Sequence, residues 1–339
     1  MISKGLPGTK LPYFLKAGEG EKYLFGGQLA TVIARQQDTA GLLEAVILSG
    51  GKGAKFPPHR HQETHESIFV LDGKLEFWHD GQSQLLSRGD FASIPAGKIH
   101  GFQMQGHYTR LLSWTVNGNA GELYSVLGEP YAKAVFPPGA DARIPQERLA
   151  KAEASVDVEF VSGQSPASPS QDLFAKAPPS GVSPFALEAG EGERLIAGSE
   201  LFTFLAHQGN TDGKFIALST QGPKGERIPN HFHEKHTETF FCLDGYMTMW
   251  ADGEELPLLP GDFVHAPAGT VHSFRLDAPY TNFLGVLAPG LFENFFRTLC
   301  DPYEDYIFPP EPRPFRFDRV MRSLHELDLR LVEDPRARH

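Results

Sequence analysis

The sequence has few cysteines, no long apolar run and no excess of positive charge, and each shortage excludes a class of protein. Its two cysteines, Cys242 and Cys300, are too few for a disulfide framework and suit a reducing compartment. No stretch of about 18 apolar residues occurs, so we expect no membrane span. The first residues also lack the apolar core of a secretory signal. A net charge of −11 disfavours a nucleic-acid partner, because a phosphate backbone requires a basic face. These features predict a soluble, cytoplasmic protein.

Turn-forming residues are abundant instead. The 339 residues include 35 glycines and 27 prolines, which favours many short strands over long helices. Apolar runs end in Asp-Gly pairs, at Asp72-Gly73 in the first half and at Asp244-Gly245 in the second. Asp-Gly between apolar runs is a strong hairpin signal. The pattern therefore predicts an all-β protein built from antiparallel strands in a sandwich or barrel.

The two halves of the chain repeat each other at a fixed offset of 172 positions. Gly18-Glu19-Gly20-Glu21 recurs from Gly190, and Gly89-Asp90-Phe91 recurs from Gly261. The register holds without a gap from about residue 18 to residue 109. Chance similarity between Gly-rich segments would not keep one register over such a length. We therefore expect a duplicated domain, with two small β-barrels in tandem.

The composition of the chain gives provisional domain limits. Residues 146–182 contain several Pro-Pro and Ser-Pro steps, so we predict an N-terminal domain at 1–145, a connection at 146–182 and a C-terminal domain at 183–339. A short helix is expected at the start of the connection, from residue 146. Helical apolar spacing at 291–299 and 318–331 predicts a helical tail that caps the second barrel.

Each repeat carries three histidines and one glutamate with identical spacing, and these residues are our candidate metal ligands. His59 and His61 are two residues apart, so both imidazoles point to one face of a strand. Glu66 begins the next strand, and a later turn delivers His100 to the same region. The full set of candidates is His59, His61, Glu66 and His100 in the first repeat, and His231, His233, Glu238 and His272 in the second.

Three imidazoles and a carboxylate form a ligand set of borderline softness. Such a set suits iron, manganese, cobalt, nickel, copper or zinc better than magnesium or calcium. We therefore expect one divalent transition metal in each domain. His65 and His236 lie beside the candidate glutamates and are interpreted as groups outside the ligand set, either behind it or on the surface.

The spacing of these residues resembles the two motifs of the cupin superfamily. Gly53, His59, His61, Glu66 and Gly73 match the first motif. Gly89, Pro95, Gly97 and His100 match the second, and the same motifs recur from Gly225 and from Gly261. The resemblance implies two cupin-type barrels in one chain, a bicupin. The chain departs from the motif at Met104 and Leu276, where an Asn often follows the last histidine by four residues. Apolar side chains there favour an aromatic substrate over a small polar acid.

Nearly the whole chain further resembles one family of bicupins, the bacterial quercetin 2,3-dioxygenases. The stretches that carry the resemblance begin at Leu11, His59, His231 and Pro289. The resemblance implies cleavage of the flavonol heterocycle by dioxygen, giving a depside and carbon monoxide. Glu66 and Glu238 are then the candidate general bases for the flavonol 3-hydroxyl.

An apolar slot for a flat polyphenol is expected beside the metal. We predict Phe69, Phe102 and Met104 as its walls in the first domain, with Phe241, Phe274 and Leu276 in the matching places of the second. The predicted partners are a flavonol, dioxygen and a second copy of the chain in a homodimer. The alternatives are a dioxygenase for another phenolic, an oxalate decarboxylase-like bicupin, or a bicupin that binds a small molecule without catalysis. An oxalate enzyme would need an arginine beside the metal, and only Arg60 and Arg110 lie near the matching strands.

Overall fold

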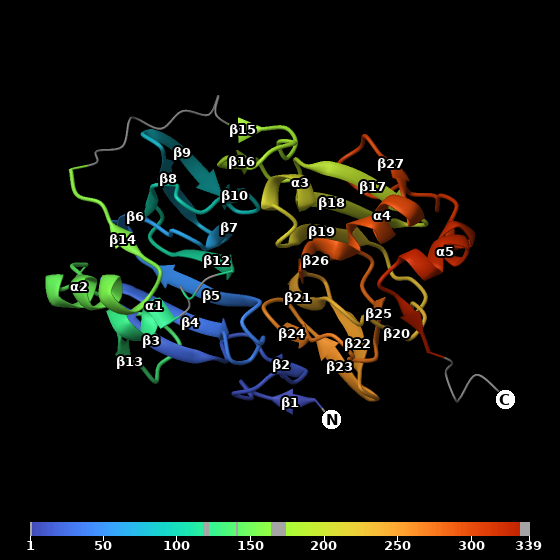
Figure 1. Ribbon diagram of the computed structural model, residues 1–339, viewed down its shortest axis with the longest axis horizontal. Helices are drawn as coiled ribbons and strands as arrows, with labels where there is room; N and C mark the ends of the chain where they lie inside the picture. Colours follow the sequence, from blue (N-terminus) through green and yellow to red (C-terminus); the bar gives the residue numbers. More distant parts are fainter. Residues whose placement is uncertain (1, 118, 120–121, 140–141, 164–173, 333–339) are drawn as a thin grey trace. The chain divides into compact units, whose positions relative to one another are not determined.

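The structure, a computed structural model, describes residues 2–117, 119, 122–139, 142–163 and 174–332. It consists of two β-rich units, each with two sheets (Figure 1). The unit that we call N-terminal comprises residues 19–191, and the C-terminal unit comprises residues 1–18 and 192–339. The prediction of an all-β chain with two barrels and few short helices is confirmed.

The N-terminal unit has a nine-stranded sheet of order β13-β3-β4-β5-β12-β7-β10-β16-β15 and a five-stranded sheet of order β14-β6-β11-β8-β9. The strands of the larger sheet are β13 (Glu129–Pro130), β3 (Glu21–Phe25), β4 (Gln28–Ala34), β5 (Leu43–Gly50), β12 (Thr109–Val116), β7 (His65–Asp72), β10 (Phe91–Ile94), β16 (Phe185–Leu187) and β15 (Phe174–Ala175). Those of the smaller are β14 (Glu159–Phe160), β6 (Lys55–Arg60), β11 (His100–Met104), β8 (Lys74–His79) and β9 (Gln82–Ser87). Alternate side chains of both sheets, such as Val46 and Ile68 from one and Phe77 from the other, form a single buried core.

The C-terminal unit repeats this topology strand for strand, with the orders β1-β2-β24-β21-β26-β19-β18-β17-β27 and β23-β22-β25-β20-β28. The strands of its larger sheet are β1 (Ser3–Lys4), β2 (Tyr13–Leu15), β24 (Phe263–Ala266), β21 (Thr237–Asp244), β26 (Thr281–Ala288), β19 (Ile216–Gly222), β18 (Glu200–Ala206), β17 (Glu193–Ala197) and β27 (Asp301–Pro302). Those of the smaller are β23 (Glu254–Leu258), β22 (Met247–Ala251), β25 (His272–Leu276), β20 (His231–Phe232) and β28 (Arg330–Leu331). The shared strand order is what the duplication inferred from the 172-residue offset predicts.

The two repeats exchange one strand. β2 comes from the first repeat but pairs with β24 of the C-terminal unit, with Tyr13 opposite His265. Its counterpart β16 comes from the second repeat and pairs with β10 of the N-terminal unit, with Phe185 opposite Ser93. The grouping of residues 1–18 with the C-terminal unit therefore differs from the predicted limit of 1–145.

The helices are short and lie at the ends of strands. They are α1 (Leu123–Leu127), α2 (Gln146–Ser155), α3 (Gln208–Thr211), η3 (Gly290–Phe292), α4 (Glu293–Leu299), α5 (Phe317–Ser323) and η4 (Leu324–Glu326). The helices expected near residues 146 and 291 are present. The tail helix expected over 318–331 is shorter, because α5 ends at Ser323 and the chain then forms β28, which pairs with β20.

The predicted connection at 146–182 is in part an element of the N-terminal unit. Its helix α2 contributes the buried Ala152 to the core, and β14 pairs with β6. Residues 164–173 of the connection lie outside the described residues. Among the described residues, no helix is long and apolar enough to cross a membrane.

Candidate metal centres

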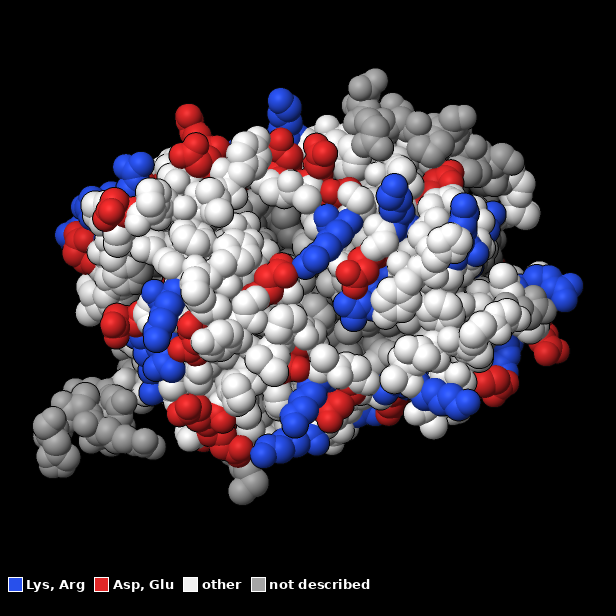
Figure 2. All heavy atoms as spheres, turned by 180° about the vertical axis from the view of Figure 1, so that it is seen from behind, with Lys and Arg blue, Asp and Glu red and all other residues white. Residues whose placement is uncertain are grey.

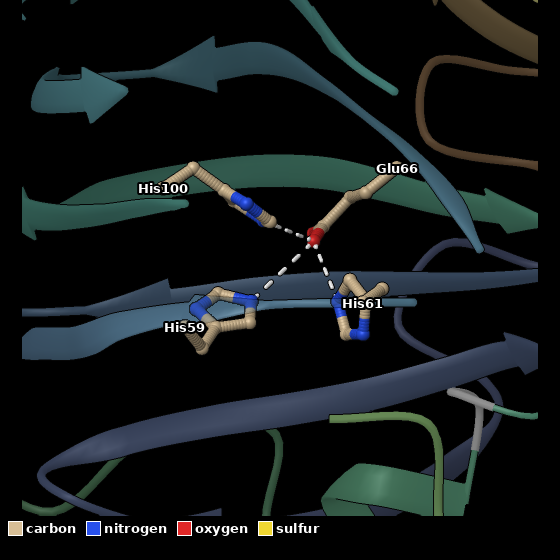
Figure 3. Close-up of side chains that lie close together, drawn as sticks. All are labelled: His59, His61, Glu66 and His100. Atoms are coloured by element: carbon tan, nitrogen blue, oxygen red, sulfur yellow. Dashed lines mark hydrogen bonds and ion pairs between the residues drawn. The ribbon is translucent and has the colours of Figure 1, made fainter. Parts of the chain in front are cut away.

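The four candidate ligands of the N-terminal unit converge inside its barrel. His59 lies on β6, His61 directly follows that strand, Glu66 lies on β7 and His100 begins β11. The Cα atoms of His59 and His100 are register partners, so the strand pairing brings these two imidazoles together. Figure 3 shows the three rings turned toward one oxygen of Glu66. All four side chains are buried.

The distances within this cluster are those of a ligand set. The Nε2 atoms of His100, His61 and His59 lie 2.9, 3.3 and 3.7 Å from Oε2 of Glu66. The other carboxylate oxygen, Oε1, accepts a hydrogen bond of 2.7 Å from the Ser113 hydroxyl. One oxygen of Glu66 is thus fixed by β12, and the other faces the imidazoles.

Backbone carbonyls determine which ring nitrogen of each histidine faces the cluster. His59 and His100 each donate from Nδ1 to the carbonyl of the residue two positions earlier, both at 3.0 Å. His61 donates from Nδ1 to the carbonyl of Asp157. With Nδ1 protonated, each neutral ring presents the Nε2 lone pair to the cluster. With the rings in this neutral form, three nitrogen lone pairs and a carboxylate oxygen form a donor set that could hold a metal cation.

Electrostatics treat the rings of this cluster differently. Burial, with the nearby His100 ring, lowers the pKa of His59 to about 3, so this ring stays neutral. The pKa of Glu66 lies well below its usual value, because its interactions with the His100, His59 and His61 rings outweigh the effect of burial. Burial alone would lower the pKa of His61, but the Glu66 carboxylate raises it. A metal ion would take the place of the proton that His61 and Glu66 otherwise share.

Asp157 supports the cluster and was not predicted from the sequence. Its carboxylate accepts backbone N–H bonds from Gln62, Glu63 and Thr64 at 2.7, 3.0 and 2.9 Å, and the Thr64 hydroxyl at 2.7 Å. This residue therefore fixes both the turn between the ligands and the orientation of the His61 ring. Asp157 follows α2 at a sequence distance of 96 residues from His61, and no local pattern signals such a contact.

The cavity beside the N-terminal cluster has a mixed wall. Val46, Phe56 and Phe102 are among its apolar residues. Polar groups also face it, among them Tyr124 and the pair in which the Thr115 hydroxyl donates to Glu44 at 3.2 Å. Burial and the Glu66 charge raise the pKa of Tyr124 well above its usual value, so its hydroxyl remains protonated.

The C-terminal unit builds the same kind of cluster from His231 on β20, His233 directly after it, Glu238 on β21 and His272 on β25. Nε2 of His272 lies 3.1 Å from Oε2 of Glu238, and Nε2 of His233 lies 3.3 Å from Oε1. Each Nδ1 again bonds a backbone carbonyl: that of Pro229 for His231, of Thr270 for His272 and of Asp328 for His233. Burial lowers the pKa of His231 to about 3. Nε2 of His233 is buried without a hydrogen-bond partner, which fits a metal ligand.

His236 distinguishes the two clusters. It takes the place of Thr64, and its Nδ1 lies 2.8 Å from Oδ2 of Asp328. Its Nε2 lies 3.3 Å from Oε1 of Glu238, and its ring lies against Phe292. Of the two positions predicted for His236, behind the ligand set or on the surface, the surface is excluded: it is fully buried and joins His233 and Glu238 in a possible ligand group. His65 is buried as well, but bonds Ser93 at 2.8 Å.

The C-terminal cavity is larger and more apolar. Nine phenylalanines line it, together with the ligands His231 and Glu238. At the places of the polar residues Glu44, Ser113, Thr115 and Tyr124, the second repeat has Ile216, Gly285, Leu287 and Phe296.

The structure brings one of the three predicted substrate contacts in the N-terminal unit to its cavity. Phe102 lines it. Phe69 lies three residues after Glu66 on β7, so its side chain points to the opposite face of the sheet, and Met104 is buried in the core. In the C-terminal unit Phe274 lines the cavity, whereas Leu276 belongs to the core. The two arginines that an oxalate enzyme might use are bound elsewhere: Arg60 pairs with Glu159 and Arg110 with Asp72.

Charged side chains of both signs are interspersed over the face drawn in Figure 2. No broad field of Lys and Arg gathers among the described residues of that face.

Comparison with known proteins agrees with this geometry. The cupin domain model matches residues 48–114 and 218–279, which contain all eight candidate ligands. The fold and the paired His-Glu clusters thus define a protein with two cupin domains. Oxalate decarboxylase from Bacillus subtilis, which has Mn(II) centres, shares the fold at a TM-score of 0.53 and 17% identity, over 83% of this chain and 77% of that one.

Two curated proteins carry the comparison further. Quercetin 2,3-dioxygenase from Bacillus subtilis is 53% identical over 333 residues, which cover 98% of this chain and 99% of that protein. Quercetin 2,3-dioxygenase from Aspergillus japonicus is 28% identical over 132 residues, 37% of this chain and 38% of that protein. The chain belongs to the quercetin 2,3-dioxygenase family of the cupins.

Proposed function

We propose that the protein is a metal-dependent flavonol 2,3-dioxygenase that cleaves the flavonol heterocycle with dioxygen and releases a depside and carbon monoxide. The observation that carries this proposal is the 53% identity, over 98% of the chain, to a quercetin 2,3-dioxygenase. The cavities support it, because both place a buried His-Glu cluster against walls rich in aromatic side chains.

The metal ligands in this proposal are His59, His61, Glu66 and His100 in one unit and His231, His233, Glu238 and His272 in the other. A bound divalent metal supplies positive charge that favours ionisation of the flavonol 3-hydroxyl. Iron and manganese are our first candidates, and manganese is the metal of the structurally similar decarboxylase. The chain's own residues hold the three Nε2 lone pairs in place through their backbone carbonyl partners.

Glu66 and Glu238 are the proposed general bases. In the N-terminal unit, Ser113 holds one oxygen of Glu66 and leaves the other facing the imidazoles. A carboxylate so placed can accept the 3-hydroxyl proton of a substrate that enters the cavity. The aromatic wall formed by Phe56 and Phe102, whose ring centroids are 5.7 Å apart, would pack against the flat substrate and exclude water.

An oxalate-type activity is disfavoured by the walls. A small dianion needs a cationic partner, and no Lys or Arg lines either cavity among the described residues.

We further propose that the protein is a cytoplasmic homodimer. The two cysteines of the chain are free and buried, which suits a reducing compartment. Analytical ultracentrifugation tests the dimeric assembly.

The test of the function is carbon monoxide release from quercetin in air, with the protein loaded separately with manganese, iron, cobalt, nickel and copper. We expect metal-dependent release that matches the loss of flavonol mole for mole. A protein that holds stoichiometric metal and releases no carbon monoxide with any of the five would contradict the proposal.

A further inference from the structure

The C-terminal cavity contains one acidic side chain that is not part of the metal cluster. Glu200, the first residue of β18, lines this cavity together with His231 and Glu238. Its carboxyl group makes no hydrogen bond or ion pair with another described residue. An isolated carboxyl group is costly in so apolar a cavity, and it is the kind of group that meets a ligand.

The chemistry of Glu200 suits a neutral polar partner. Burial raises its pKa to about 7, because the apolar surroundings disfavour the charged form. A carboxylic acid has both a donor and an acceptor, so it can pair with a phenolic hydroxyl.

The N-terminal unit lacks this feature at the matching place. Gln28 is the counterpart of Glu200, and its Nε2 donates to the carbonyl of Lys55 at 3.1 Å. Gln28 is fully buried and does not line the N-terminal cavity. Lys55 is the first residue of β6, which has six residues. The strand that corresponds to β6 in the C-terminal unit, β20, has only two residues, so it offers Glu200 no backbone partner like the carbonyl of Lys55.

Glu200 lies near Leu276, which is four residues along the strand from the candidate ligand His272. A Cβ placed on Gly222 would lie 3.3 Å from Cγ of Glu200 and 2.7 Å from Cδ1 of Leu276, so this glycine allows both side chains to approach. Leu276 ends the strand that His272 begins, and four residues of a strand span about 13 Å. A molecule the length of a flavonol can therefore reach from the ligands to Glu200.

We propose that Glu200 is a specificity-determining residue of the C-terminal cavity, where it hydrogen-bonds a phenolic hydroxyl at the end of the substrate remote from the metal. The inference rests on the proposed flavonol function and adds to it. Glu200 would give the C-terminal centre a preference for hydroxylated flavonols. Its counterpart Gln28 gives the N-terminal centre no such preference.

The test uses full-length, metal-loaded protein in which His59→Ala and His100→Ala remove the N-terminal centre. Binding of quercetin and of 3-hydroxyflavone, which lacks the other hydroxyls, is measured without oxygen. Glu200→Leu should weaken quercetin binding about tenfold and leave 3-hydroxyflavone within about twofold. Glu200→Gln, which keeps hydrogen-bonding atoms, should retain most of the preference for quercetin. Gln28→Leu, the matched control, should leave the preference unchanged.

The outcomes separate the two proposals. An equal loss of affinity for both flavonols in Glu200→Leu, at unchanged metal content, means that Glu200 only shapes the cavity. This result overturns the assignment and leaves the flavonol function standing. Failure of this single-centre protein to bind either flavonol, while the wild type binds them, also overturns the assignment alone, and failure of the wild type as well overturns both proposals.

Discussion

The two metal centres share their ligands but not their surroundings. In both, a backbone carbonyl fixes each candidate ring, but Nε2 atoms of three candidate histidines face the glutamate in the N-terminal unit and those of His233 and His272 do so in the C-terminal unit. The N-terminal cavity adds Ser113, Thr115 and Tyr124, whereas the C-terminal cavity has apolar residues or glycine at these places. Duplication has thus retained the candidate metal ligands while the walls have changed. The shared ligand spacing predicts that both centres hold a transition metal, and the cavity walls determine which substrate each centre accepts.

The largest effect is expected from removing the ligands of one centre. His59→Ala with His100→Ala, or His231→Ala with His272→Ala, deletes two of four ligands in one unit. Because each unit has its own cluster, either double variant should keep about half of the bound metal, measured by elemental analysis. Loss of all metal from either variant would show that the centres depend on each other.

Replacing the glutamates should reveal which centre turns over. Glu66→Gln and Glu238→Gln keep the shape of the side chain but remove the base. Turnover at a centre that uses the base should fall by about 10²- to 10⁴-fold. Carbon monoxide release, compared at equal metal content, measures this effect. Wild-type turnover in both variants and in their combination would refute the base assignment.

The aspartates behind the clusters should have smaller effects. Asp157→Ala and Asp328→Ala remove the acceptors of a turn and disturb His61 or His233, so metal affinity should fall about 10- to 100-fold in the affected unit. A chelator competition measures this change. Asp157→Asn, which keeps one acceptor oxygen, should lose less.

Asp157 also makes the stability of the folded protein depend on pH. The pKa of Asp157 is lowered, because hydrogen bonds from Thr64 and from backbone N–H groups outweigh burial. A lowered pKa in the folded state stabilises the protein above the unfolded-state pKa, and this stability is lost as the pH falls through the folded-state pKa. Thermal unfolding of the wild type and of Asp157→Ala should therefore converge in acid. A difference in melting temperature that persists in acid would contradict this origin.

The smallest effect is expected from exchanging one wall residue. Ser113→Ala removes the hydrogen bond to Oε1 of Glu66, which should raise the pKa of that carboxyl and lower N-terminal turnover several-fold. In Gly285→Ser the new side chain meets Cδ1 of Leu287 at 3.5 Å, an ordinary contact, so this reverse variant should fold. The pH profile of turnover in each single-centre protein is the readout, and an unchanged profile in Ser113→Ala would argue against the role of the hydroxyl.

The repeat in the sequence was sufficient to predict the duplication and the histidines and glutamates that lie together in each unit, because both depend on spacing along strands. It was not sufficient for Asp157 and Asp328, whose contacts with the ligand turns join residues more than 90 positions apart. Strand alternation predicts that the His236 side chain points away from the ligand set. The rule does not apply to His236, because β21 begins only at Thr237. Alternation would have excluded Phe69 as a wall residue. The exchange of β2 and β16 joins strands that are far apart in the sequence, so no local pattern predicts it.

Carbon monoxide release by the two single-centre double variants, with quercetin and with 3-hydroxyflavone, tests the central claim most directly. Two centres with the same ligand set in different cavities should act independently. Each double variant should therefore retain about half of the metal that the wild type binds. The C-terminal centre should then show the stronger preference for quercetin. Identical substrate preferences in the two variants, at equal metal content, would contradict the account.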